Sequence, residues 1–299
     1  MKLLITGAAG FIGSHFVDYV LDHHPEDTVI GLDKLTYAGS LDNLAGRRQD
    51  RRFRFLRADI CDREAVFPLL EREGVDCIVN FAAESHVDRS LRDPGVFLRT
   101  NVLGVGVLLD GTAQFGVSRF HQVSTDEVYG DLPLDRPELK FDEGSPLRPS
   151  SPYSASKAAA DLLALSYFRS FGTPVTITRS SNNYGPRQYP EKLIPRMIRR
   201  ARAGRPLPVY GDGRNVRDWI HVLDHCAAVD LVIRKGRVGE VYNVGGGHER
   251  SNLDLVRLLL SLMGKDESLL SFTADRKGHD RRYALSSDKL TGELGWRPA

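Results

Sequence analysis

The sequence predicts an α/β fold in which helices cover both faces of a doubly wound parallel sheet, with a smaller lobe at the C-terminal end. Apolar, strand-like runs alternate with helical patterns between residues 2 and 179, and this alternation is typical of parallel sheets. A Gly-x-x-Gly-x-x-Gly turn, Gly7–Gly13, follows the first apolar run. After Arg179 the pattern becomes irregular, as in Asn182–Pro186 and Gly211–Gly213. Together these features indicate a Rossmann-type sheet followed by a second lobe.

The composition fits a globular enzyme or binding protein. A chain of 299 residues can fill a large core or two lobes. The 41 Lys and Arg against 39 Asp and Glu leave a formal net charge of +2, so no general attraction to nucleic acid is expected. Cys61, Cys77 and Cys226 lack Cys-x-x-Cys spacing and are expected to be free thiols in a reducing cytoplasm. No apolar run looks long enough to span a membrane, and glycines interrupt Met1–Ile5 too soon for a signal peptide.

The first strand and helix are expected to bind a dinucleotide. Lys2–Thr6 is an apolar strand, and Ser14–Asp22 a helix. The glycines between them allow a tight turn and a close approach of a pyrophosphate to the helix N-terminus. The next strand, Thr28–Leu32, ends at Asp33, twenty residues after Gly13. An acid at that distance binds the adenosine ribose and repels a 2′-phosphate, so we expect NAD and not NADP.

The remaining expected elements follow in order. The strands are Phe53–Leu56, Cys77–Phe81, Arg119–Val123 and Val175–Arg179, and the helices are Arg63–Glu73, Asn101–Phe115 and Tyr153–Phe171. Asp131–Pro152 contains five prolines and is expected to be a loop over the functional site. We expect residues 1–180, with about 218–242, to form the dinucleotide-binding domain. Residues 181–217 and 243–299 are then the second lobe.

Two short segments carry acid and base groups. Tyr153 and Lys157 are four residues apart, so they share one face of a helix. A neighbouring Lys⁺ is expected to lower the pKa of the tyrosine, which could then take a proton from a sugar hydroxyl. Asp126 and Glu127 follow Thr125, and repulsion between two close carboxylates separates their titrations into an acid and a base.

Each segment also has a structural interpretation. A Tyr and a Lys four apart occur often by chance, and Ser124–Glu127 is good N-cap chemistry. Their occurrence together behind a dinucleotide-binding turn favours the catalytic interpretation.

Other polar residues have simpler explanations. His221 and His225 lack a further ligand at metal-site spacing, so no metal is predicted. The arginines between residues 196 and 205 are interpreted as a solvated helix face and not as a nucleic-acid surface; they are Arg196, Arg199, Arg200, Arg202 and Arg205.

Seven motifs together closely resemble those of the dTDP-glucose 4,6-dehydratases, a family of extended short-chain dehydrogenase/reductases. They are Gly7–Gly13, Asp33–Gly39, Ala82–Asp88, Ser124–Gly130, Tyr153–Lys157, Asn182–Pro186 and Asp275–Tyr283. The resemblance covers essentially the whole chain. Two departures are Ser181, where the family often has another small residue, and the end at Ala299, where relatives usually continue into a final helix.

The resemblance implies the conversion of a nucleotide-diphospho-glucose, most simply dTDP-glucose, to its 4-keto-6-deoxy form with NAD used and regenerated. Tyr153 would take the proton of the 4-hydroxyl, with Thr125 on the 4-oxygen and Lys157 on the nicotinamide ribose. Glu127 would then remove the carbon 5 proton while protonated Asp126 helps the 6-hydroxyl leave. Hydride returns to carbon 6.

The resemblance also implies binding residues. For the cofactor these are Gly7, Gly10, Phe11, Ile12, Gly13, Asp33, Lys34, Leu35, Thr36, Asp59, Ile60, Phe81, Ala82, Ala83, Ser85, Thr100, Tyr153, Lys157 and Asn183. For the substrate they are Ser85, Thr125, Asp126, Glu127, Asn182, Glu191, Lys192, Leu193, Pro208, Val209, Tyr210, Arg217, Asn243, Arg276, His279 and Tyr283. The guanidinium groups of Arg217 and Arg276 suit a diphosphate. The helices around residues 101–115 and 153–171 are expected to pair across a two-fold axis in a homodimer.

Two alternatives stay open at this point. A nucleotide-sugar 4-epimerase or decarboxylase of the same superfamily keeps the Tyr/Lys pair but generally lacks Asp-Glu after the threonine. A non-catalytic dinucleotide-binding regulator could discard Tyr153 or Lys157, and both are present. The nucleotide base of the substrate does not follow from the sequence.

Overall fold

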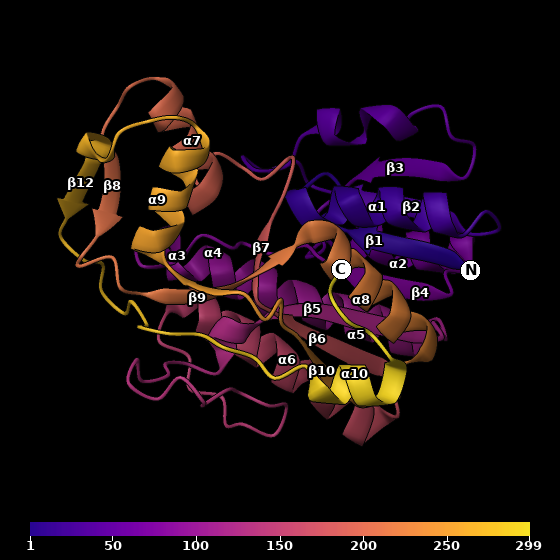
Figure 1. Ribbon diagram of the computed structural model, residues 1–299. Helices are drawn as coiled ribbons and strands as arrows, with labels where there is room; N and C mark the ends of the chain where they lie inside the picture. The colour runs from indigo at the N-terminus through magenta and orange to yellow at the C-terminus, as the bar shows by residue number, and fades with distance from the viewer.

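The computed structural model describes residues 1–299, and its largest unit is a seven-stranded sheet (Figure 1). Every neighbouring pair of strands in this sheet is parallel. The strand order is β10-β6-β5-β4-β1-β2-β3. The bounds are Lys2–Thr6 (β1), Thr28–Asp33 (β2), Phe53–Arg57 (β3), Cys77–Asn80 (β4), Arg119–Thr125 (β5), Val175–Ser180 (β6) and Val241–Val244 (β10). The expected doubly wound sheet is confirmed.

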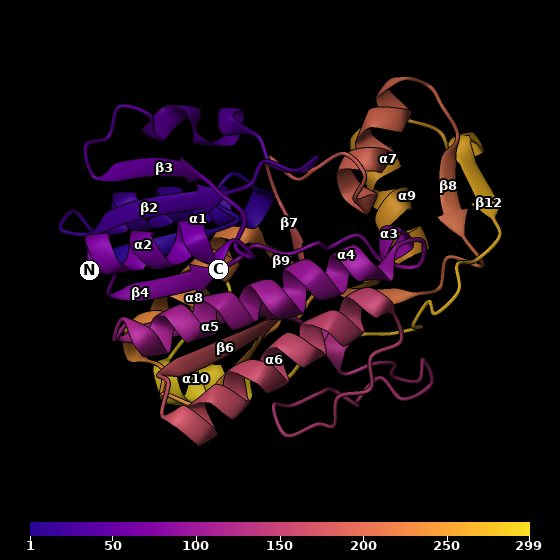
Figure 2. The same cartoon turned by 180° about the vertical axis from the view of Figure 1, so that it is seen from behind.

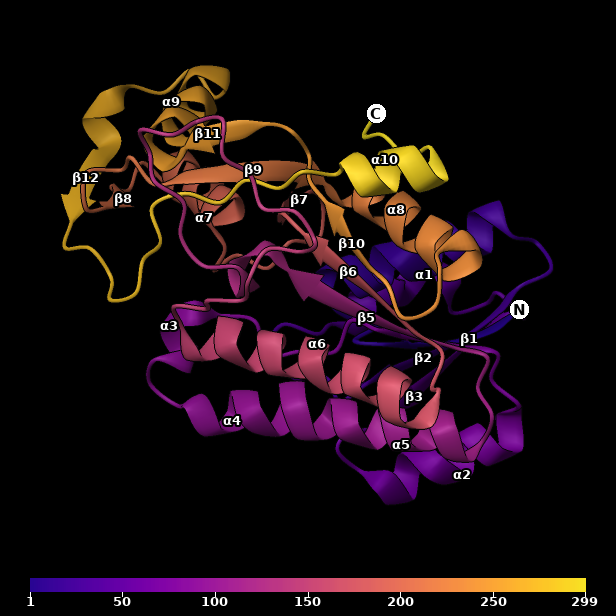
Figure 3. The ribbon, with the colours of Figure 1, turned by 90° about the horizontal axis from the view of Figure 1, so that it is seen from below.

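Helices cover both faces of the sheet (Figure 3). The α-helices are Phe11–His23 (α1), Arg63–Glu73 (α2), Val87–Ser90 (α3), Pro94–Leu98 (α4), Gly104–Gln114 (α5), Pro152–Phe171 (α6), Leu193–Arg202 (α7), Val222–Lys235 (α8), Asn252–Leu262 (α9) and Asp288–Leu294 (α10). Short 3₁₀ turns span Leu41–Arg47, Asp126–Val128 and Glu267–Leu269, and a π-helical turn spans Arg99–Leu103.

Strand β1 shows how the sheet divides two cores. Leu4 packs on one face, in the core that includes Leu69 of α2 and Leu108 of α5. Its neighbours Leu3 and Ile5 pack on the other face, in the core that includes helices α1 and α8. Because successive strand residues point to opposite faces, a strand covered on both sides is apolar throughout.

The second lobe is built on a parallel pair of strands, β8 (Leu207–Tyr210) and β12 (Leu270–Thr273), which packs with α7 and α9. A three-stranded sheet, β11-β9-β7, lies between this lobe and the main sheet (Figure 1). Its strands are Glu249–Ser251 (β11), Val216–His221 (β9) and Asn182–Tyr184 (β7).

The main sheet extends past the boundary expected near residue 242. Asn243 and Val244 pair with β6 as part of β10, and Leu290 of α10 packs in the same small core as Val232 of α8. The rest of the expected division into domains stays a prediction.

The helix expected at Asn101–Phe115 begins earlier, because Pro94 starts a helical run that continues through α4, the π-turn and α5. Proline suits the first turn of a helix, where its missing N–H has no partner to lose. By length and composition alone the run Pro94–Gln114 could cross a membrane, contrary to our expectation of no such stretch. Half of its most apolar window is buried inside the fold, as in the core helix of a globular protein.

The prediction that Asp131–Pro152 lies over the functional site is wrong. The Leu132 N–H donates to the Arg282 carbonyl, and Phe141 forms an isolated bridge with Leu285. The Phe141 ring also stacks on Tyr129, with ring centroids 5.0 Å apart. These contacts hold the loop against the C-terminal segment (Figure 3), and it lines neither of the two main cavities.

Candidate active site

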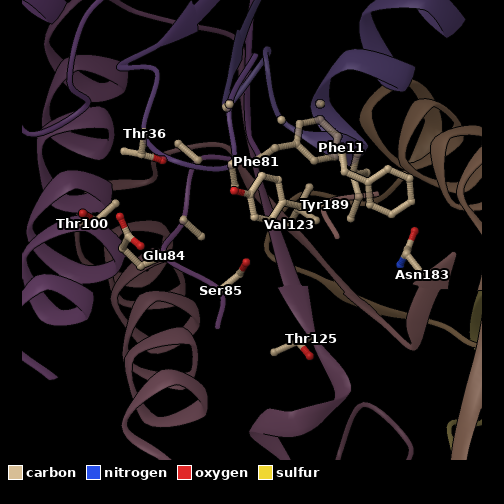
Figure 4. A pocket seen from close by; sticks show the side chains of 18 of the residues that line it. Phe11, Thr36, Phe81, Glu84, Ser85, Thr100, Val123, Thr125, Asn183 and Tyr189 are labelled. Carbon is tan, nitrogen blue, oxygen red and sulfur yellow. The ribbon is translucent and has the colours of Figure 1, made fainter. Parts of the chain in front are cut away.

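Two adjoining cavities open at the carboxyl ends of the strands, where open parallel sheets bind ligands. The larger cavity, about 300 Å³, follows the ends of β1, β2, β4 and β5. In Figure 4 its side chains come from both sides, with Thr36 and Thr100 on one side and Phe11 and Asn183 on the other. The smaller cavity, about 180 Å³, lies toward the second lobe. Ser85, Glu127, Asn182, Glu191 and Lys192 line both cavities.

The glycine turn requires glycine at its first and last positions. Gly7 has φ +65°, and a Cβ there would lie 2.7 Å from the backbone nitrogen of Ala82. A Cβ on Gly13 would lie 2.2 Å from the Gly7 carbonyl oxygen. The turn therefore brings α1 close to β1 and leaves its first N–H groups facing the cavity, where a pyrophosphate can bind.

Asp33 is held rigidly at the end of β2. One carboxylate oxygen accepts the Ala9 N–H at 3.0 Å, and the other accepts the Leu35 N–H at 2.7 Å. Burial raises the pKa of Asp33, while these two N–H groups lower it. The Lys34 ammonium instead lies 3.5 Å from Asp59 and 3.3 Å from the Thr100 hydroxyl, so the lysine does not pair with Asp33.

All but one of the predicted cofactor residues line the larger cavity. The exception is Leu35, whose side chain packs against the core beside α1. Its backbone has φ +59°, and this conformation turns its N–H toward Asp33 and its side chain inward. The sequence pattern did not indicate that the Leu35 side chain would point into the core and not into the cavity.

The five predicted catalytic residues meet at the larger cavity. Thr125 ends β5, and the Thr125 hydroxyl donates to Asp126 Oδ1 at 3.2 Å and accepts the Glu127 N–H at 3.3 Å. Tyr153 and Lys157 lie in the first turns of α6. The start of α6 is fixed by reciprocal hydrogen bonds between the Ser151 and Ser154 side chains and backbone.

The two carboxyls have different surroundings. Burial raises the pKa of Asp126 well above its usual value, and the neighbouring Glu127 raises it further. Burial also raises the pKa of Glu127, but Arg276, Arg217 and Lys192 oppose that change. Asp126 is therefore the group that holds a proton, and Glu127 is the better base.

The expectation that Lys157 lowers the pKa of Tyr153 is wrong. Burial raises the pKa of Tyr153, and the carboxylates of Glu127 and Asp126 add to the rise. The Lys157 ammonium donates to the Val123 carbonyl at 2.6 Å, and burial lowers its pKa to about 8. The lysine is therefore engaged with β5 and not with the phenol.

The smaller cavity is suited to an anion. Lys192, Arg196, Arg217 and Arg276 line it, and the Arg217 guanidinium lies 4.2 Å from the centre of the Tyr283 ring. The buried atoms without partners include Asn182 Oδ1, Trp219 Nε1 and Arg276 Nε. Because buried polar atoms are normally paired, these atoms indicate a polar ligand.

The predicted substrate residues all line one cavity or the other, except Asn243. Asn243 Oδ1 accepts the Tyr129 hydroxyl at 2.7 Å, and its Nδ2 donates to the Phe141 carbonyl at 3.1 Å. Asn243 therefore holds the 131–152 loop in place, and its expected contact with substrate stays a prediction. The residue lies in β10 and has no exposed surface.

Several cavity residues were not predicted. His86 and Asp88 belong to the Ala82–Asp88 motif, which could have indicated them, and Trp219 carries no sequence signal. Arg196 lines the cavity, unlike the exposed Arg199, Arg202 and Arg205 of the same run. Tyr189, Gln188 and Glu84 are among the unpredicted residues of the larger cavity.

His221 and His225, the two histidines for which no metal was predicted, make structural contacts. His221 caps α8 by accepting the Leu223 N–H. The buried His225 places Nδ1 2.8 Å from Asn183 Oδ1. His225 therefore supports a cavity residue.

The family model that matches this chain and two similar proteins are all described as nucleotide-sugar 4,6-dehydratases. Residues 4–299 match the family model described as GDP-mannose 4,6 dehydratase. The chain is 51% identical to dTDP-glucose 4,6-dehydratase of Actinoplanes sp., over all of this chain and 93% of that protein. It is 54% identical to the enzyme of the same name from Streptomyces griseus, over 99% of this chain and 89% of that protein.

Solved structures agree. All of the chain superposes on 92% of dTDP-glucose 4,6-dehydratase from Streptomyces venezuelae with NAD bound, with a TM-score of 0.96 and 51% identity. It also superposes on 94% of UDP-glucose 4-epimerase from Thermotoga maritima, with a TM-score of 0.89 and 31% identity.

Proposed function

We propose that this chain, which belongs to the dTDP-glucose 4,6-dehydratase family, removes water from dTDP-glucose to give the 4-keto-6-deoxy sugar with bound NAD. One observation carries the proposal. The acid and base pair Asp126 and Glu127 reaches the same cavity as Tyr153 and Lys157. A simple dehydrogenase needs only the second pair, whereas elimination of water also needs the first.

The lining of the larger cavity favours NAD as its ligand. Its glycine turn leaves room for a pyrophosphate, and Asp33 is fixed at the end of β2, where it would bind the adenosine ribose. When bound, NAD⁺ accepts hydride from carbon 4 of the sugar and returns it to carbon 6. Lys157 would hold the nicotinamide ribose, and Asn183, supported by His225, would contact the cofactor.

The smaller cavity supports the nucleotide part of the substrate. Arg217 and Arg276 would bind the diphosphate, and Tyr210 and Tyr283 line the same wall. The sugar would then lie where the two cavities meet, beside Glu127.

The residues divide the proton transfers. Tyr153 would take the proton of the 4-hydroxyl as the phenolate, which the positive charges of Lys157 and of bound NAD⁺ would favour over the neutral phenol, while Thr125 hydrogen-bonds the 4-oxygen. The resulting ketone acidifies the carbon 5 proton, which Glu127 removes. Protonated Asp126 gives its proton to the departing 6-hydroxyl, and water leaves. A proton on Glu127 then returns to carbon 5.

The direct test is incubation of protein and NAD⁺ with separate nucleotide sugars: dTDP-glucose, UDP-glucose and GDP-mannose. We expect dTDP-glucose to lose the mass of one water and to give a 4-keto product. A product of unchanged mass would favour the 4-epimerase alternative. Bound NAD without turnover of any sugar would favour the regulator.

Two further proposals concern where the protein works and how it assembles. We propose that the protein works in the cytoplasm, which agrees with its three free thiols. We also propose a homodimer, because exposed apolar side chains lie along α4, the π-turn and α6, and these segments are neighbours (Figure 2). They are Val96, Leu98, Leu103 and Leu162.

A further inference from the structure

We infer that residues 187–192, here named the strap, close over the cofactor cavity and hold NAD in place between turnovers through a hydrogen bond from Tyr37 to Glu191. This inference rests on the proposed function, because it assigns NAD to the larger cavity. Tyr37 and Glu191 would thus act on the cofactor by positioning the strap and not by chemistry.

The strap and the loop after β2 form two sides of one cavity. The strap connects β7 to α7 and runs beside that loop between the two lobes (Figures 1 and 2). The loop contributes Thr36, Ala38 and Gly39 to the lining, and the strap contributes Gln188 and Tyr189. A contact between these two segments therefore spans the cavity.

That contact is made by Tyr37. The Tyr37 hydroxyl donates to Glu191 Oε1 at 2.9 Å, and its ring meets the Tyr189 ring edge-on, with centroids 5.4 Å apart. The Arg89 guanidinium lies 3.6 Å from the centre of the Tyr37 ring on another side. His86 Nε2 lies 3.7 Å from Glu191 Oε2. The Tyr37 side chain is therefore held by groups from two segments, the strap and α3.

The two ends of the strap are also tied to the dinucleotide-binding domain. At one end the Arg187 guanidinium forms an ion pair with Asp18 of α1 at 2.7 Å and lies 3.4 Å from the Ser14 hydroxyl. At the other end the Lys192 ammonium donates to the Ser85 carbonyl at 2.8 Å. With Tyr37, the strap has attachments to the segments after β1, β2 and β4.

Backbone strain marks the same two segments. Leu35, in the loop, has φ +59°, and Arg187, in the strap, has φ +64°. They are the only non-glycine residues of the chain with positive φ. Such conformations are unfavourable for L-residues and persist where the surroundings over-determine them, which is common at ligand clamps.

The chemistry gives a reason for retaining the cofactor. Hydride taken from carbon 4 must return to carbon 6 of the same sugar. If NADH escaped before that return, the enzyme would be left with an unsaturated or oxidised sugar and no reductant. Slow dissociation of the cofactor therefore protects the reaction cycle.

The test measures dissociation of NAD from the loaded protein without substrate, by mixing it with excess isotopically labelled NAD and following the exchange. Tyr37→Phe keeps the ring and removes only the donor to Glu191. Since a hydrogen bond to a charged group is worth about tenfold or more in an equilibrium, we expect exchange about tenfold faster. Glu191→Gln keeps an acceptor oxygen but loses the charge, so a smaller acceleration is expected.

The matched control is Tyr184→Phe, which removes a hydroxyl that has no hydrogen-bond partner and lies outside both cavities; its exchange rate should equal that of the unaltered protein. If both Tyr37→Phe and Glu191→Gln exchanged NAD at the rate of the unaltered protein, the proposed role of the strap in holding NAD would be wrong. Because exchange is read without turnover, failure of the dehydratase assay would count against the proposed function alone.

Discussion

Glu127 and Asp126 are adjacent in the chain but occupy different electrostatic surroundings. Asp126 is 1% exposed, and its Oδ2 has no hydrogen-bond partner. Glu127 faces the cations of the smaller cavity, Arg276, Arg217 and Lys192. The same residues that would bind a diphosphate therefore also favour ionised Glu127, so substrate binding and base strength are linked.

We predict that Asp126→Asn and Glu127→Gln impair dehydration more than the initial oxidation. These carboxyls are assigned to elimination, whereas Tyr153 serves oxidation. In a single turnover with dTDP-glucose, enzyme-bound NADH or the 4-keto-glucose intermediate should accumulate, measured by absorbance and mass. Loss of oxidation and elimination in equal proportion would show that the division of roles is wrong.

Asp33 should decide between NAD and NADP. Its carboxylate is fixed by two backbone N–H groups, and Lys34 is directed to Asp59. Cofactor-stripped protein should therefore be activated by NAD⁺ and poorly by NADP⁺. Asp33→Asn removes the charge and should improve the relative response to NADP⁺ by about tenfold, because the like-charge repulsion is lost. Equal activation of the unaltered protein by both would contradict the assignment.

The buried charge of Lys157 should lower the free energy of unfolding. Its pKa falls from 10.5 to about 8 on burial, so the unfolded chain binds the proton more tightly and the charged form favours unfolding. The penalty, about 3 kcal/mol at most, is fully present below pH 8 and disappears as pH rises toward 10.5. Cofactor-free Lys157→Met should therefore unfold at a higher temperature at pH 7.

The pH dependence of this stability difference should show whether the buried charge of Lys157 causes it. The advantage of Lys157→Met over the unaltered protein should shrink by about half between pH 7 and pH 9.5. A constant difference across that range would attribute the change to packing and not to the buried charge.

Helix α6 carries the Tyr153/Lys157 pair, and its first turn determines where that pair lies. Pro152 occupies the first helical position, and Ser151 and Ser154 exchange hydrogen bonds of 3.1 and 3.0 Å between side chain and backbone. This arrangement satisfies N–H groups that would otherwise lack partners. The precision of the catalytic pair therefore depends on a cap two residues before it.

Ser151→Ala should lower the free energy of unfolding by about 1 kcal/mol, the usual worth of an N-cap, and should reduce kcat as Tyr153 loses its fixed position. Chemical denaturation and steady-state assays measure both effects. Ser166→Ala on the exposed face of the same helix is the control and should leave kcat unchanged. An equal fall in stability in both variants would contradict a special role for the cap.

The strands that the sequence predicted best are those buried on both faces, such as β1 and β4, because continuous apolar runs mark them clearly. The glycine turn and Asp33 were placed correctly because fixed backbone geometry links their spacing to their position. Leu35 and Asn243 were expected at the cavities but lie outside their linings. The position of Leu35 depends on an unusual φ, and that of Asn243 on a contact with a distant loop. Tertiary contacts of that kind leave no local pattern.

The two lobes line different cavities, and the reaction is expected where these cavities meet. The main sheet presents the larger cavity, and α7, β8, β9, α9 and the C-terminal segment supply most of the smaller one. Glu127 and Lys192 line both, so a nucleotide sugar would contact both lobes at once. Links such as Arg276 to Asp88, at 3.7 Å, already join the lobes without ligand.

The exposed apolar side chains on the back of the main sheet should be covered by a second copy of this chain. Leu98 is 53% exposed, Leu103 65% and Leu162 58%, and large apolar side chains that are exposed on neighbouring helices are typical of protein interfaces. Because α4, the π-turn and α6 run side by side (Figures 2 and 3), two copies related by a two-fold axis could pack these helices together.

We therefore expect a homodimer by light scattering at micromolar concentration, and a monomer for the double variant Leu103→Glu, Leu162→Glu. A buried charge without a partner in such an interface costs far more than it does on a free surface. Leu262→Glu is the control, since Leu262 lies on α9 in the other lobe and is 75% exposed; this variant should remain dimeric. A monomeric unaltered protein would show that these side chains face solvent or another partner.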